Sequence, residues 1–596
     1  MNMAEISKGI SRRGFLTASG AVAAGAAAWG LAGCAPKAKR EKAATEASAS
    51  TAGGTAGFDG TGNLTWLGEA PSISDSEVSE TLEADVIVVG LGASGPAAAR
   101  AAAEAGAKVL CFEKASALTS VASDIAALGG NTLGKWGRGD DFLDKTMIVN
   151  RHMAEGSYHT RFGVIERWAN ESGATLDWFI EASKDAYIAD ETWSEIPADK
   201  QANYIAPFFY PMPETYDWTR EDLPCYPTSI TFSNLKKVQE DNLQVALDKG
   251  AEVRYSCPAV KLIAENGKVT GVYAKDATSG KYVKATAKSV VLTTGDYLGN
   301  EDMMKFYAPE TVENGVGTLC ITMDSEGKPV NVGDGHKMAA WAGAAIEQWH
   351  APMIHHMGGG AGADGRGVMG ANGYLWLNLH GKRFMNEDLP GQQLENQVEL
   401  QPGRECYQLF DSAWPEQLKY FPAAHGVACI YREDELPAYT ANGLKINVRT
   451  PADLEAAVAD GRCIEADTID ELLSKISGID AEAAKKSIQR YNELAAAGKD
   501  SDFGKSSQRL FALDKAPFYA AKCTPALNLG ALGGVVSDED CHVFTGEGEK
   551  IEGLYVAGGP QGGRFAVEYP ISMKGLSMGM CITFGRIAGE NAAAHK

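Results

Sequence analysis

Short apolar runs alternate with longer helical segments along most of this chain. Residues 86–89 read Val-Ile-Val-Val, a β-branched run typical of a parallel strand that is buried on both faces. Two later runs, 290–292 and 554–557, are also short and apolar, and a glycine follows soon after each of them. Between them, residues 469–498 place aliphatic side chains at helical spacing, which predicts amphipathic helix. The pattern as a whole predicts an α/β fold.

The first apolar run leads directly into a glycine-rich turn. Gly90, Gly92 and Gly95 form a G-x-G-x-x-G motif between that strand and an alanine-rich helix that begins at Pro96. Such a turn lets a pyrophosphate approach the backbone at the positive N-terminal end of the helix. A second apolar strand ends in Glu113, whose carboxylate can accept hydrogen bonds from a ribose. This order of elements predicts a dinucleotide site.

Composition and charge argue against several classes of protein. The 596 residues carry a formal net charge of −22 and include 67 glycines. An acidic surface repels phosphate backbones, which argues against nucleic-acid binding. The 11 cysteines are scattered, with no C-x-x-C and no C-x-x-C-H, which argues against a zinc ribbon or an attached haem. We also expect no metal at His350, His355 and His356, because two adjacent side chains do not easily reach one ion.

The N-terminus has the features of an export signal. Arg12-Arg13 precedes an uncharged Ala/Gly-rich stretch that ends in Leu31-Ala32-Gly33-Cys34. The arginine pair resembles a twin-arginine signal, and the last four residues resemble a lipobox in which Cys34 becomes lipidated. An uncleaved transmembrane anchor is the alternative, although alanine and glycine insert weakly. We expect a signal over 1–33, a flexible tether over 34–81, and an exported protein that is anchored to the cell membrane as a lipoprotein.

Four further motifs resemble one flavoprotein superfamily. They are residues 127–131 (Ala-Leu-Gly-Gly-Asn), 332–335 (Val-Gly-Asp-Gly), 378–387 and 583–590. With the glycine turn, they resemble the superfamily of soluble fumarate reductases, urocanate reductases and 3-ketosteroid dehydrogenases, from about Leu82 to the end. The resemblance implies a Rossmann-like FAD-binding domain in two sequence pieces, with an inserted α+β capping domain.

The resemblance also implies domain boundaries and a set of cofactor contacts. The FAD-binding domain is expected at 82–347 and 526–596, and the capping domain at 348–525. The residues expected to bind FAD are Gly90, Gly92, Ser94, Gly95, Glu113, Lys114, Asp124, Gly129, Gly130, Gly295, Asp334, Gly558, Gly559, Ser577 and Met578.

In this superfamily a hydride moves between the flavin and one carbon of a C–C bond, while a side chain moves a proton at the neighbouring carbon. His350, within residues 348–352, resembles the histidine with which fumarate-reductase-like enzymes hold a substrate carboxylate. However, Gly391 stands where the proton-donating arginine of those enzymes follows Asn386-Glu387. A fumarate reductase in the strict sense is therefore disfavoured.

The segment from Tyr569 to Gly575 resembles a loop of the ketosteroid dehydrogenases. By that resemblance, the Tyr569 hydroxyl and the Gly575 N–H polarise a carbonyl of the substrate. The proton donor stays unassigned among Tyr569, Arg564 and Glu568, and Arg564 has the alternative role of binding an anionic group. The aromatic residues between 203 and 232 fit a substrate pocket or, equally well, a packed loop.

These features together predict an FAD-dependent oxidoreductase that reduces an activated C=C bond in an enone or an aryl-conjugated enoate. Outside the cytoplasm NADH is not at hand, so a membrane-linked cytochrome or quinol carrier would supply electrons in a respiratory role. The first alternative is a 3-ketosteroid-type dehydrogenase working oxidatively. The second is a non-catalytic flavin electron-transfer or binding lipoprotein.

Overall fold

The computed structural model describes residues 64–120, 122–190, 196–209, 212–213, 216–221, 224–318, 322–323, 327–358, 367–388, 391–422 and 449–595. The expected signal sequence, Cys34 and most of the expected tether lie outside these residues. All of the described residues belong to one unit, Gly53–Lys596. Within them, no helix is both long and apolar enough to cross a membrane.

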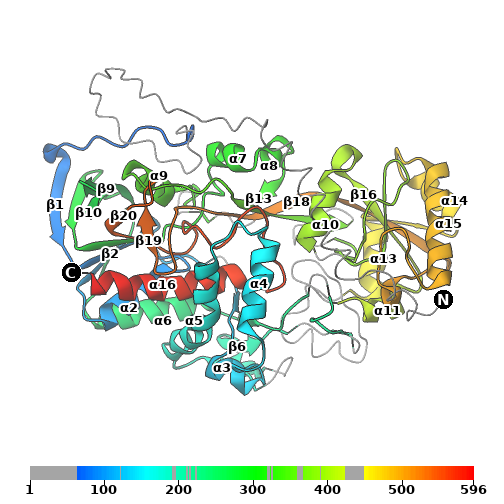
Figure 1. Cartoon of the computed structure of the whole chain (residues 1–596), viewed down its shortest axis with the longest axis horizontal. Helices are drawn as coiled ribbons and strands as arrows, with labels where there is room; N and C mark the ends of the chain where they lie inside the picture. The colour runs from blue at the N-terminus through cyan, green and yellow to red at the C-terminus, as the bar shows by residue number, and fades with distance from the viewer. Residues whose placement is uncertain are drawn as a thin grey trace, which may run out of the picture. The chain divides into compact units, whose positions relative to one another are not determined.

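A ten-stranded sheet joins strands from residues 78–292 with two strands from residues 542–556 (Figure 1). Its strands run in the order β1-β11-β10-β20-β12-β2-β3-β8, with β9 paired to β10 and β19 paired to β20. The three apolar runs of the sequence analysis are adjacent parallel strands, with Ile87 of β2 opposite Val290 of β12, and Val290 opposite Leu554 of β20. The bounds are β1 (Val78–Glu83), β2 (Val86–Val89), β3 (Val109–Phe112), β8 (Glu252–Arg254), β9 (Ala259–Glu265), β10 (Lys268–Lys275), β11 (Tyr282–Thr286), β12 (Ser289–Leu292), β19 (His542–Phe544) and β20 (Lys550–Val556).

The tether prediction is wrong at its C-terminal end. Residues 64–81 are folded: Trp66 is buried beside Tyr307, and β1 pairs in parallel with β11. Every second residue of β1 is half-buried. These residues are folded because distant parts of the chain, at Tyr307 and in β11, pack against them, which local composition does not reveal.

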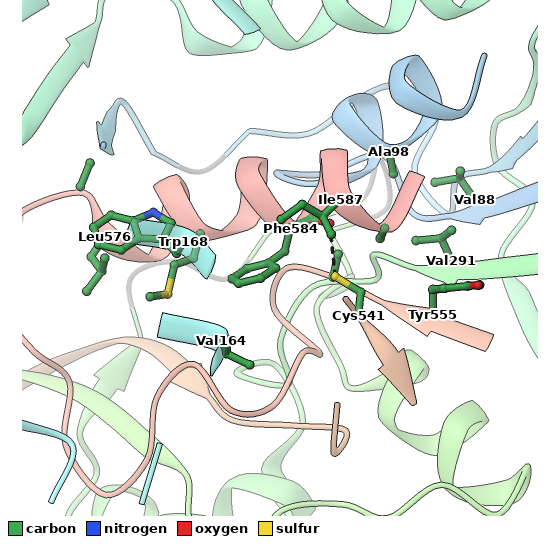
Figure 2. Packing of buried hydrophobic residues seen from close by; sticks show 14 of the residues in the cluster. Val88, Ala98, Val164, Trp168, Val291, Cys541, Tyr555, Leu576, Phe584 and Ile587 are labelled. Carbon is green, nitrogen blue, oxygen red and sulfur yellow. Dashed lines mark hydrogen bonds between the residues drawn. The ribbon is translucent and has the colours of Figure 1, made fainter. Parts of the chain in front are cut away.

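Helices α2 (Gly95–Glu104), α6 (Leu235–Asp248) and α16 (Leu576–Ala594) lie side by side against this sheet (Figure 1). Glycine permits α16 to approach α2 closely, because a Cβ at Gly585 would lie 2.4 Å from the Ser94 carbonyl oxygen. Figure 2 shows Phe584 and Ile587 of α16 in the core with Val88, Ala98 and Val291. The other helices of this part are α3 (Gly130–Lys135), α4 (Lys145–Glu155), α5 (Phe162–Glu181), α7 (Glu301–Tyr307), α8 (Pro309–Glu313) and α9 (Asp334–Trp341), with short 3-10 helices at Asp75–Glu77 and Ala198–Lys200.

Two smaller sheets complete the fold. One has the order β4-β7-β6-β5, and the other has the order β13-β18-β16-β15, with β14 and β17 also paired to β18. The bounds are β4 (Asp124–Ala126), β5 (Tyr187–Ile188), β6 (Tyr204–Pro207), β7 (Ser229–Phe232), β13 (Gly317–Thr318), β14 (Ala351–Gly358), β15 (Leu375–Asn378), β16 (Cys406–Asp411), β17 (Cys463–Ala466) and β18 (Phe518–Leu532).

The β18 sheet carries most of the predicted capping domain. The amphipathic stretch 469–498 forms α14 (Ile469–Lys475) and α15 (Ala481–Ala497), whose apolar side chains pack on that sheet as predicted. The expected domain boundary at 525 falls inside the continuous strand β18, and the exact boundaries stay predictions. The remaining helices are α10 (Gly391–Glu399), α11 (Trp414–Gln417) and α13 (Pro451–Ala459), with 3-10 helices at Pro402–Arg404, Leu418–Tyr420 and Ser507–Arg509.

The motif at 378–387 builds a buried ion network within this part of the chain. Arg383 donates to both carboxylate oxygens of Glu387, at 2.6 and 2.7 Å, and to Asp500 at 2.7 Å. Burial alone would raise the pKa of Asp500, but the hydrogen bonds from Arg383 and from the N–H groups of Phe503 and Lys505 lower it to about 2. The motif therefore has a structural role here.

Replacing Asp500 by asparagine should lower the free energy of unfolding at pH 7 by about 2 kcal/mol, the scale of a two-unit pKa shift. Because the folded-state pKa is depressed, this stabilisation is present above about pH 4 and is lost as the pH falls toward 2. Urea unfolding curves should therefore show the gap between wild type and Asp500→Asn closing over that range. Asp467→Asn, at an exposed carboxylate, is the control, and a gap that does not depend on pH would contradict the assignment.

Candidate active site

A cavity of about 330 Å³ lies at the carboxyl ends of the parallel strands. Its wall includes Val89 and Phe112, the last residues of β2 and β3, and Thr293, which follows β12. Gly559, beyond the end of β20, is also in the wall. Open parallel sheets bind ligands at this edge. The volume falls within the range of small-molecule sites.

The glycine turn forms one wall of the cavity. Gly90 has φ +94°, and a Cβ there would lie 2.7 Å from the Thr293 carbonyl oxygen. A Cβ at Gly95 would lie 2.0 Å from the Gly90 carbonyl oxygen, so helix α2 begins in contact with the turn. A Cβ at Gly92 would meet nothing within 4 Å, which leaves its backbone open to a ligand.

Glu113 is held rigidly at the end of β3. The N–H of Leu91 donates to its Oε2 at 2.5 Å, and the N–H of Ala115 donates to its Oε1 at 2.7 Å. Burial raises the pKa of this carboxyl, and the two backbone hydrogen bonds oppose that effect. Each carboxylate oxygen retains acceptor capacity, so Glu113 can still accept hydrogen bonds from a ribose.

The structure brings most of the expected FAD contacts together. The cavity is lined by Gly90, Gly92, Ser94, Glu113, Lys114, Asp124, Gly295, Asp334, Gly559, Ser577 and Met578, and by Tyr569 and Gly575 of the expected catalytic set.

Four expected FAD contacts do not line the cavity. Gly95 lies beneath the turn, and a Cβ at Gly558 would lie 2.2 Å from the Ser94 hydroxyl oxygen. A Cβ at Gly129 would contact Asp140, and one at Gly130 would contact Gly173. These glycines are needed for close packing beside the site, and direct contact with the cofactor is not supported for them.

The expected role of His350 is not supported. Its Nδ1 accepts from the Tyr297 hydroxyl at 2.6 Å, its Nε2 lies 3.0 Å from the Glu347 carbonyl oxygen, and its ring stacks on Tyr307. Burial, together with His336, lowers the pKa of His350 to about 3. Both ring nitrogens are thus occupied in a neutral imidazole that does not line the cavity, and such a group cannot hold a carboxylate there.

Arg564 also lies outside the cavity wall. It is fully buried, its Nε donates to the Gln561 carbonyl oxygen at 3.2 Å, and its Nη1 lies 3.8 Å from the Cys581 sulfur. Cys581 lines the cavity, so Arg564 sits behind it and contributes positive charge near Asp296. Its Nη2 is buried and has no hydrogen-bond partner among the described residues, and its expected role as proton donor or anion-binding group stays a prediction.

Tyr569 and Gly575 are placed together at the start of α16. Tyr569 is buried, and its hydroxyl oxygen accepts from the Ser577 N–H at 3.3 Å. Gly575 has φ +80° and precedes the first helical residue. Burial raises the pKa of Tyr569 to about 12, so the hydroxyl keeps its proton at neutral pH and can donate it. The positive end of the helix reinforces that donor.

Asp124 and Lys574 form a buried pair beside the cavity. Lys574 Nζ lies 3.0 Å from Asp124 Oδ2, while Asp124 Oδ1 has no hydrogen-bond partner among the described residues. Burial lowers the pKa of Lys574, and Asp124 opposes that shift. Asp124 therefore offers an open acceptor on a cavity-lining residue.

Among the wall residues that sequence reasoning missed, Asp296 and Gln239 are two with polar side chains. Asp296 directly follows Gly295, so the strand-to-glycine pattern was an available signal for it. Gln239 lies within α6, where no motif marks it. Its side chain is fully buried, and neither amide atom has a hydrogen-bond partner among the described residues. A buried amide of this kind costs free energy unless a ligand satisfies it.

The residues present fit FAD. The glycine turn at the N-terminus of α2 suits a pyrophosphate, Glu113 suits a ribose, and the unsatisfied Gln239 amide offers both a donor and an acceptor. In contrast, no three His, Cys, Asp or Glu side chains gather as a metal site within the described part of the chain. The side chains of His355 and His356 lie outside the described residues.

Gln239→Leu should weaken FAD binding by about tenfold, the scale of one lost hydrogen bond. Fluorescence titration of the apoprotein with FAD measures this change. The melting temperature of the apoprotein should stay equal or rise, because the variant removes a buried unsatisfied amide. Gln244→Leu, on the exposed face of α6, is the control. An unchanged FAD dissociation constant in Gln239→Leu would remove this residue from the site.

Comparison with known proteins agrees with this geometry. The chain is 26% identical to vinyl phenol reductase of Lactiplantibacillus plantarum, over 86% of this chain and 96% of the relative. It is also 26% identical to a fumarate reductase (cytochrome) of Shewanella frigidimarina, over 89% of this chain and 79% of the relative. The crystal structure of a 3-ketosteroid-Δ4-(5α)-dehydrogenase from Rhodococcus jostii has the same fold, with a TM-score of 0.62 at 22% identity over 87% of this chain and 99% of that one.

The FAD binding domain family matches residues 85–570, which is most of the chain. With the cavity and its fit to FAD, this match shows that the chain belongs to that family of flavoproteins and is an FAD-dependent oxidoreductase, related to the fumarate reductases, that acts on C=C bonds.

Proposed function

We propose that this flavoprotein reduces an activated C=C bond in a small enone or aryl-conjugated enoate. The observation that carries the proposal is the Tyr569 hydroxyl, which is buried on the cavity, accepts from the Ser577 N–H and keeps its own proton. When bound, FAD supplies the hydride. The protein then has to polarise the substrate and provide a proton.

Tyr569 and Gly575 are suited to polarise a carbonyl. A hydroxyl hydrogen and a backbone N–H at the start of α16 form a donor pair for an oxygen on which negative charge develops. Charge drawn onto that oxygen makes the β-carbon of the conjugated double bond electrophilic. The α-carbon then takes a proton from a different group, because the hydroxyl hydrogen of Tyr569 is already engaged with the carbonyl oxygen. Arg564 and Glu568 are the remaining candidates from the sequence, and neither lines the cavity.

The sequence favours this substrate class over a four-carbon dicarboxylate, because Gly391 stands where the fumarate-reductase-like enzymes have a proton-donating arginine. The charged residues of the cavity wall do not decide this point, since Glu113, Lys114, Asp124 and Asp334 are expected contacts of FAD. The similarity to a vinyl phenol reductase supports an aryl-conjugated substrate.

We also propose an extracytoplasmic respiratory role for the protein. Its support is the twin-arginine and lipobox pattern that ends at Cys34, which lies outside the described residues. A membrane-linked cytochrome or quinol carrier would supply the electrons. The relative from Shewanella is named a fumarate reductase (cytochrome), which is in keeping with such a donor.

The second candidate function is oxidative dehydrogenation of a ketosteroid-like substrate. The Tyr569–Gly575 pair favours it as much as reduction, since one carbonyl clamp serves both directions. A flavin electron carrier without catalysis, the second alternative from the sequence, is not proposed, because the family match and the relatives show an oxidoreductase that acts on C=C bonds.

Anaerobic mixing separates these functions. Photoreduced protein should be reoxidised by enones or cinnamates, and much less by dicarboxylates, when flavin absorbance is followed. Bleaching of the oxidised flavin by saturated ketosteroids, without reoxidation by any alkene, would support the dehydrogenase instead. If neither change occurs, both proposed substrate classes are wrong.

Tyr569→Phe should lower turnover by at least about tenfold, because loss of one such donor costs ~2.7–4 kcal/mol of transition-state stabilisation. FAD content should stay unchanged. Because the pKa of Tyr569 is about 12, wild-type turnover should show no loss from tyrosine ionisation below about pH 10. Tyr407→Phe, on β16 and outside the cavity wall, is the matched control. Near-normal turnover in Tyr569→Phe would exclude this residue from the mechanism.

A further inference from the structure

Two cysteines stand opposite each other in the sheet that contains β18. Strands β16 and β18 are antiparallel, and Cys406 of β16 is the direct ladder partner of Cys523 of β18. Direct partners in an antiparallel ladder have Cα atoms about 4.5–5.5 Å apart and side chains on the same face. A disulfide requires Cα atoms about 4.4–6.8 Å apart. The backbone therefore already meets the main geometric condition for a bond between them.

The two thiols share one buried environment. Both side chains are fully buried, in a cluster with Trp376, Met385 and Leu394. Burial raises the pKa of the Cys406 thiol, and its hydrogen bond with Cys523 raises it further. The Cys406 thiol thus stays protonated and unreactive while the strands are closed. Reaction would take place during folding or on local opening of this sheet.

The other described cysteines on strands have no thiol opposite them. Cys463 of β17 faces Ala521 of β18, although it is buried on a neighbouring strand of the same sheet. Cys111 of β3 lies between Val88 and Val253. The Cys406–Cys523 pair is therefore distinguished by register rather than by burial.

We propose that Cys406 and Cys523 are a disulfide modification site. In the reaction, one cysteine thiolate attacks the disulfide of an oxidant, forms a mixed disulfide and releases one thiol of the oxidant. The second cysteine thiolate then attacks the mixed disulfide and releases the other thiol, so the two cysteines lose two protons and two electrons. The oxidant, a protein or low-molecular-weight disulfide, is reduced to two thiols. In the cell its supply rests on the proposed export, since disulfides persist in oxidising compartments.

The Cys406–Cys523 disulfide would cross-link β16 to β18, the strand that extends to the cavity. β18 runs on from Cys523 to Leu529, Gly530 and Leu532, which line the cavity. A cross-link to β16 would restrict the unfolded chain over the long loop between the two cysteines, and so would stabilise the β18 sheet. The oxidised protein should accordingly unfold at a higher temperature than the reduced protein.

The test uses the FAD-loaded full chain. One sample is incubated with oxidised glutathione and another with dithiothreitol, and each is then denatured in N-ethylmaleimide, digested and mapped by mass spectrometry. We expect one linked pair of peptides, containing Cys406 and Cys523, in the oxidised sample alone. We also expect its thermal midpoint to exceed that of the reduced sample by several degrees.

Variants separate this bond from a general effect of oxidant. Cys406→Ser and Cys523→Ser should each lose the linked peptides and the oxidant-dependent rise, whereas Cys463→Ser should keep both. If either serine variant fails to fold, the wild-type peptide map still decides. Alkylation of both Cys406 and Cys523 after oxidation, or a link from either one to a different cysteine, would overturn the proposal whatever the outcome for the alkene substrates.

Discussion

Close backbone packing around the glycine turn is the constraint on which this site depends. A Cβ at Gly90 would meet Thr293, and a Cβ at Gly559 would lie 2.5 Å from the carbonyl carbon of Gly295. Three segments far apart in sequence therefore meet at one edge of the sheet, at distances that side chains would prevent. The backbones of these glycine-containing segments therefore form part of the cavity wall.

Acidic residues and hydrogen-bond donors line the cavity beside these backbones. The acids that line the cavity are fixed by backbone amides or by paired lysines, as Glu113 and Asp334 show. Tyr569 and Gly575, at the start of α16, also line the cavity and offer hydrogen-bond donors to it.

His350 and Arg564 show that burial affects which side chains can contact a ligand. His350 stands in a sequence context suited to anion binding, yet Tyr297 and the Glu347 carbonyl occupy both of its nitrogens. Arg564 lies behind Cys581 and does not itself line the cavity. In both cases desolvation and local partners, which a motif does not encode, decide whether a group is available to a ligand.

The sequence alone predicted β2, β3, β12 and β20, the glycine turn and a dinucleotide site that includes Glu113, because apolar periodicity and backbone-permissive glycines are local properties. The assignment of FAD came from the resemblance of longer motifs to a flavoprotein superfamily, and the family match confirms it. Tyr569 and Gly575 both line the cavity, while the catalytic roles implied for them stay predictions. Only the tertiary structure decided that Gln239 joins the cavity, that His350 does not, and that residues 64–81 fold. Each of these outcomes depends on which distant segment packs against the residue, and neither spacing nor composition carries that information.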